Sequence, residues 1–159
     1  MNIEKTNIRE KQAIGAICLK LFSSRYQITY PGVNELIQHQ LNLLISDNLS
    51  EWNTKGINIE IPGRGDDLPE KLLQDIPKAI HKDFNLLIMA VTEIGIANMF
   101  TAFTEEPHIQ MLDSLSIIKK HNIKINVPEI LLNGNSSKDW GLPWTKEKFE
   151  KLKEEIEIL

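Results

Sequence analysis

Histidine and carboxylate side chains are the residues of this chain whose types could support acid–base or metal chemistry. The four histidines are scattered, and no two have the spacing of a zinc motif such as H-E-x-x-H. They are His39, His81, His108 and His121. His108 follows two acids closely, but no second histidine stands on the same predicted helix. We therefore expect no metal site, and we expect His39 and His108 to be exposed.

Motifs for nucleotides and nucleophiles are also absent. The sequence contains no G-x-x-x-x-G-K-[ST], no G-x-G-x-x-G and no G-x-S-x-G. The stretch Gly63-Arg64-Gly65 is too short to hold a phosphate, and the aspartates after it would repel one. The sequence thus predicts no catalytic residue and no cofactor, and it favours a binding protein over an enzyme.

Glu93 is the one acid within a long apolar segment. An unpaired carboxylate is costly to bury, so two interpretations are open. In the first, Glu93 reaches an edge of the helical bundle or pairs with a base or a tryptophan N–H. In the second, it faces a groove together with Asn98 and receives a ligand or partner.

Charge is distributed unevenly along the chain. The formal net charge is −4, but the segment from Gly56 to Ile118 holds ten acids against four bases, so the two flanks together carry +2. No basic stripe of the kind that nucleic-acid binding needs is present. We therefore expect no nucleic acid as partner, and a protein partner of positive charge is the alternative that this distribution favours.

Several residues of the acidic segment and two tryptophans are candidates for a partner-binding surface. The helix predicted after Pro107 places three polar residues on one face, and acids of nearby turns join them if the loops fold toward that helix. A loop with the sequence DWGLPW supplies aromatic side chains, which dominate interface hot spots. The candidates are Glu60, Asp66, Asp67, Glu105, Glu106, Gln110, Asp113, Trp140 and Trp144. The alternatives are an ordinary solvated surface, and tryptophans that fold onto the core.

Apolar periodicity predicts one mostly α domain over residues 1–159, a bundle of about five or six helices. The predicted helices lie near residues 14–22, 31–45, 69–73, 77–103, 107–121 and 145–159. The segment 77–103 is apolar nearly all round, which predicts that it lies at the centre of the bundle. Isoleucine alternates with polar residues over 57–61 and 123–127, which predicts two short strands paired as a small ribbon. The stretch 133–137 is a predicted loop.

The compartment follows from the termini, the apolar segments and the cysteine content. The N-terminus has no signal-peptide pattern, and polar residues interrupt the most apolar window, 84–103, so we expect no membrane span. A single cysteine, Cys18, excludes an internal disulfide and lies in a predicted buried stripe. A soluble cytoplasmic protein is the expectation.

Two stretches prompt a comparison with a known class. The acidic turn GRGDDLP at 63–69 and the loop DWGLPW at 139–144, in a small acidic helical chain, resemble bacterial immunity proteins, including those of contact-dependent inhibition systems. The resemblance implies a toxin partner, for example a basic nuclease, whose active site is covered by the acidic surface. Two alternatives remain: a regulatory or adaptor module with another protein partner, and an enzyme or ligand binder with a groove lined by Glu93, Asn98 and His108.

Overall fold

A helix from the N-terminal part of the chain runs through the centre of the molecule. The computed structural model describes residues 3–132 and 139–157, and in it every residue of helix α1 (Ile8–Arg25) from Ile8 to Leu19 is buried. Asn7 and Glu10 form a capping box, in which the Asn7 side chain accepts from the Glu10 N–H and the Glu10 carboxylate accepts from the Asn7 N–H. This reciprocal cap fixes where α1 begins.

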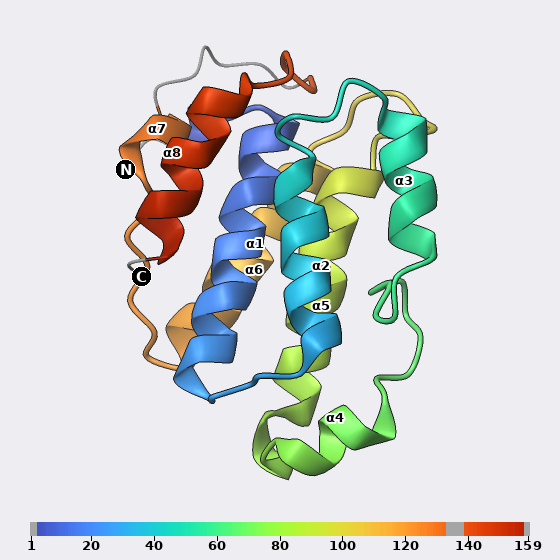
Figure 1. Ribbon diagram of the computed structural model, residues 1–159, viewed down its shortest axis with the longest axis vertical. Helices are drawn as coiled ribbons and strands as arrows, with labels where there is room; N and C mark the ends of the chain where they lie inside the picture. The colour runs from blue at the N-terminus through green and yellow to red at the C-terminus, as the bar shows by residue number, and fades with distance from the viewer. Residues whose placement is uncertain (1–2, 133–138, 158–159) are drawn as a thin grey trace.

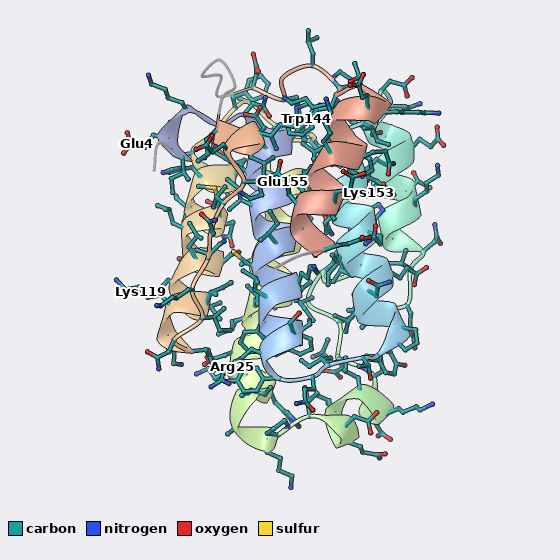
Figure 2. All side chains as sticks on the ribbon, turned by 60° about the vertical axis from the view of Figure 1, so that its left-hand side comes forward. Glu4, Arg25, Lys119, Trp144, Lys153 and Glu155 are labelled. Carbon is teal, nitrogen blue, oxygen red and sulfur yellow. The ribbon has the colours of Figure 1, made fainter. Side chains whose placement is uncertain are left out.

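Several of the other helices lie around α1. Helices α2 (Pro31–Asn42), α5 (His81–Ile96) and α6 (Glu106–Lys120) pack directly against it. Helix α8 (Lys146–Glu157) lies across α1 from the α5–α6 pair, as the two views together show (Figures 1 and 2). The remaining elements are η1 (Ile3–Lys5), α3 (Leu49–Ile57), α4 (Glu70–Asp75), η2 (Lys78–Ile80) and α7 (Glu129–Leu132).

The central position of α1 differs from the prediction, which placed the segment 77–103 there. Helix α5 packs on α1 but leaves Leu86 and Met89 partly exposed. Helix α1 carries polar residues in its first turns. Their side chains are buried and donate hydrogen bonds to backbone carbonyls. Gln12 donates to the Val91 carbonyl at 2.8 Å, and Arg9 donates to the Leu43 carbonyl. Polar side chains with such partners can occupy a core that counting apolar residues would not assign to them.

The mostly α class agrees with the sequence, but the number of helices does not. The described residues contain eight α-helices rather than five or six, because the short helices α3 and α7 were not predicted. Asn48 caps the start of α3, since its side chain accepts from the Glu51 N–H at 3.0 Å. Helix α5 ends at Ile96 instead of continuing to residue 103.

The predicted β ribbon is wrong. No strand occurs in residues 3–132 and 139–157: Ile57 ends α3, and residues 123–127 form an irregular segment. The two segments lie on opposite sides of the bundle and cannot pair (Figure 1). Ile61 and Val127 are nevertheless buried, so the alternation reflects extended chain that packs its apolar residues onto helices.

One continuous cluster of buried apolar side chains joins residues of α1 to residues of α8. Cys18 lies in it, fully buried, and burial raises the pKa of its thiol. His39 is also buried, which corrects the expectation of an exposed residue: its ring stacks on Trp52 of α3 at a centroid distance of 4.7 Å. No helix in the described part of the chain is long and apolar enough to cross a membrane. The predicted loop 133–137 lies outside the described residues.

Candidate partner-binding groove

The candidate site is a groove of about 680 Å³ between α5 and α6. Helix α5 contributes the side chains Leu86, Met89, Ala90, Glu93 and Ile96. Helix α6 contributes Glu106, Gln110, Asp113, Ser116 and Ile117, and the turn before α4 adds Gly63 and Arg64. On each helix these residues are spaced mostly three or four apart, so their side chains lie on one face of the helix and line the same groove. The helices run antiparallel, joined by residues 97–105 (Figure 1).

Glu93 is one of three carboxylates that line this groove. Burial raises the pKa of its carboxyl, the negative charge of Glu106 raises it further, and the positive charge of Arg64 opposes both. Arg64 is itself held by a hydrogen bond from its Nη2 to the Asn53 Oδ1 of α3 at 2.6 Å. Glu93 therefore has a neighbouring base, as in the first interpretation, and it also lines a groove, but without the Asn98 that the second interpretation placed beside it.

The turn that carries Arg64 sits close against α5 because it begins with a glycine. Gly63 has a φ of +68°, and a Cβ at this position would lie 2.3 Å from the Thr92 hydroxyl oxygen. Only glycine permits both the backbone conformation and the close approach. The exposed Asp66 follows, near enough to Arg64 for their charges to attract, and Asp67 beside it is also exposed.

Helix α6 supplies three of the residues proposed from sequence. Glu106 lies in its first turn, where the helix dipole favours a carboxylate, and accepts a hydrogen bond from the Gln110 side chain at 2.7 Å. Asp113 is exposed one turn further. Glu105, directly before α6, does not line the groove; its charge interacts with the buried ammonium of Lys11, whose pKa is lowered by burial.

The other sequence candidates lie elsewhere. Glu60 accepts a hydrogen bond from the Tyr30 hydroxyl at the start of α2. Trp140 and Trp144 are half-buried, and the backbone N–H of Trp144 donates to the Leu44 carbonyl at 2.7 Å. The Lys148 ammonium lies 3.5 Å from the centroid of the Trp144 ring. Figure 2 shows Trp144 at the start of α8, and neither tryptophan lines the groove, so the tryptophan loop does not extend the acidic surface.

The ligand groove that the sequence suggested, with Glu93, Asn98 and His108, is not assembled. Of these three residues, only Glu93 lines the groove. Asn98 is buried and hydrogen bonds with Thr104. Among the described residues, no group of three or more His, Cys, Asp or Glu side chains is placed to hold a metal ion.

Sequence reasoning missed two sets of exposed apolar residues, one that lines the groove and one in the loop that joins α5 to α6. Leu86 and Met89 are 43% and 38% exposed, and Phe100 and Phe103 in the loop before α6 are 78% and 56% exposed. The available signal was that α5 is apolar on more than one face, which we interpreted as burial instead of as an exposed apolar strip.

No protein-family model matches the chain, and neither curated proteins nor solved structures give a match.

Proposed function

We propose that this protein is a non-catalytic binding protein that receives a positively charged segment of a protein partner in the α5–α6 groove. The observation that carries the proposal is the composition of that groove. Three carboxylates, those of Glu93, Glu106 and Asp113, face a single base, Arg64, beside the apolar side chains of both helices. Such a surface complements a partner that is both basic and apolar.

We further propose that the partner is a toxin domain and that binding neutralises it. The resemblance to immunity proteins supplies this class of partner. A nuclease active site holds a polyanionic backbone and is therefore lined by lysine and arginine. An acidic groove would be attracted to such a site and would occupy the position of the nucleic acid.

The test compares two charge reversals of equal size. The groove variant is Glu106→Lys with Asp113→Lys, and the control is Glu154→Lys with Glu155→Lys on α8, where both acids are exposed (Figure 2 labels Glu155). Each changes the net charge by the same amount. The partner is the product of the neighbouring open reading frame, purified and measured by calorimetry at several salt concentrations.

We expect the groove variant to weaken binding at least tenfold at low salt and to flatten its salt dependence, with a much smaller effect in the control. Equal affinities of the two variants would contradict the proposal. Neutralisation is read separately, as loss of the partner's toxic activity in the complex. Binding without that loss would favour the regulatory or adaptor alternative.

A small-ligand or enzymatic function has two observations in its favour. The groove volume falls within the range of roughly 300–1,000 Å³ typical of ligand sites, and Glu93 has a raised pKa. A small cationic ligand in the groove would need the negative charge of Glu93. A Glu93→Gln variant that loses affinity for such a ligand but still binds the protein partner would support this second candidate.

A further inference from the structure

We infer that the groove receives a basic amphipathic α-helix of the partner, about three turns long, and that Phe100 and Phe103 close over one end of it. This inference rests on the proposed function and specifies which kind of partner segment the groove recognises.

The backbone of the occupant must satisfy its own hydrogen bonds. Both sides of the groove are helices, whose mid-helix N–H and C=O groups are bonded within each helix. No strand edge is present in the described part of the chain, so an extended peptide would find no backbone partners here. A helix brings its hydrogen bonds with it, which makes it the peptide conformation that an apolar groove between two helices accommodates.

The length of the groove fits a short helix. Its lining runs from Leu86 to Ile96 on α5 and from Glu106 to Ile117 on α6. At about 1.5 Å per residue, each side is roughly 15 Å long, which corresponds to about three turns of a partner helix. Leu86 and Met89 provide the apolar contact, and methionine adapts its shape to different side chains.

Charge gives the groove two different ends. Because α5 and α6 are antiparallel, Glu93 and Glu106 lie near the connecting loop, whereas Leu86 and Ile117 lie at the opposite end. Asp113 lies between them. The partner helix should therefore carry its lysines or arginines toward the loop end and along one face.

The loop at the acidic end displays two phenylalanines. It is closed at its base by Asn98, whose Oδ1 accepts from the Thr104 N–H at 3.2 Å and from the Thr104 hydroxyl at 2.8 Å. Asn98 Nδ2 also donates to the Thr104 carbonyl at 3.2 Å. Phe100 and Phe103, both exposed, are thus held on a pre-formed loop, which lowers the entropy cost of using them in an interface.

A second copy of this chain fits the groove poorly. In a two-fold dimer the same surface faces itself, so the carboxylates of Glu93, Glu106 and Asp113 would oppose their own counterparts. Like charges brought together in this way are destabilising. Charge complementarity therefore selects a basic partner over self-association.

The experiment uses a fluorescent peptide of about 14 residues, made of leucine and lysine with helical periodicity. A scrambled peptide of identical composition keeps the charge but has no apolar face. We expect the amphipathic peptide to bind at least tenfold more tightly by anisotropy, and to gain helical circular dichroism on binding. Leu86→Ser with Met89→Ser should weaken that binding at least tenfold, and Phe100→Ser with Phe103→Ser about fivefold.

The matched control is Leu142→Ser, which removes an apolar side chain that is 85% exposed and lies in the tryptophan loop. It should leave peptide affinity unchanged, and thermal melts should show that every variant is folded. Equal binding of both peptides, or binding insensitive to the Leu86 and Met89 substitutions, would overturn the inference that the occupant is a helix. The charge-reversal test would still decide the proposed function. Dimerisation in sedimentation that these substitutions abolish would show a second copy as the occupant. Absence of peptide binding up to millimolar concentration also overturns the inference.

Discussion

Asp83 joins the start of α5 to the end of α6 through its carboxylate, and His121 extends this contact to the end of α1. In the first turn of α5, its Oδ2 accepts from Lys120 Nζ at 2.7 Å and from His121 Nε2 at 2.8 Å, both at the end of α6. The Tyr26 hydroxyl, at the end of α1, lies 2.6 Å from His121 Nδ1. The hydrogen bond from Lys120, followed by that from His121, lowers the pKa of Asp83.

A carboxyl whose pKa is lower in the folded protein stabilises the fold above its unfolded pKa, and this contribution disappears as the pH falls through the folded value. We predict that Asp83→Asn lowers the free energy of unfolding at pH 7 by about 1–3 kcal/mol. The difference from the wild type should shrink below about pH 4. Urea unfolding at pH 7, 5 and 3 measures it, with the exposed Asp67→Asn as control. A difference independent of pH would refute this role.

His39 gives a second pH dependence in a separate window. Burial, with help from the positive charges of Arg64 and Lys55, lowers its pKa from 6.5 to about 4. The unfolded chain therefore binds a proton more readily than the folded protein between these values, so stability falls as the pH falls from 6.5 toward 4. The loss due to this one residue amounts to at most about 3 kcal/mol.

We predict that His39→Gln is less stable than the wild type at pH 7, because it loses the ring contact with Trp52. Its stability should nevertheless decline less between pH 7 and pH 4.5 than that of the wild type. The comparison uses chemical unfolding at both pH values. An equally steep decline in the variant would show that His39 is not the titrating group.

At the scale of elements, the α5–α6 connection depends on Asn98. The hydrogen bonds between its side chain and Thr104 take the place of the further helical turns that the apolar sequence predicted. Since Asn98 is only 4% exposed, removing it leaves the loop without its closing contact.

We predict that Asn98→Ala lowers the free energy of unfolding by about 1–2 kcal/mol, because the released groups of Thr104 can still be hydrated. Its larger effect should be local: faster amide hydrogen exchange over residues 99–104, with α1 unchanged. Asn126→Ala, at an exposed position, serves as the matched substitution. Unchanged exchange in the loop would show that Asn98 does not hold it closed.

At the scale of the molecule, a single apolar cluster connects α1, α2, α5, α6 and α8. We predict that these helices unfold together, so that far-UV circular dichroism and tryptophan fluorescence give the same urea midpoint. Two variants make the test sharper. In Trp140→Phe with Trp144→Phe, the fluorescence comes only from Trp52 of α3. In Trp52→Phe, it comes only from the tryptophans of the C-terminal loop. Separate midpoints would mean that α8 or α3 unfolds independently.

The sequence by itself determined the helical class and the starts of α2, α4, α6 and α8 to within a residue. Pro31 begins α2, the Thr104–Pro107 stretch precedes and opens α6, and the Thr145 hydroxyl accepts from the Lys148 N–H at the start of α8. These signals are local, because a cap or a proline acts on the backbone within one turn. The excess of acids in the middle of the chain is likewise a property of composition alone.

Only the tertiary structure decided which residues share a surface. Periodicity gives each helix an apolar face but not the neighbour that covers it, so the sequence placed α5 at the centre and did not reveal that Leu86 and Met89 stay uncovered. The same limit applies to the candidate surface residues: Asp113 lines the α5–α6 groove, whereas Trp144 does not. The groove depends on contacts between α5, α6 and the Gly63 turn, and such long-range contacts are set by packing.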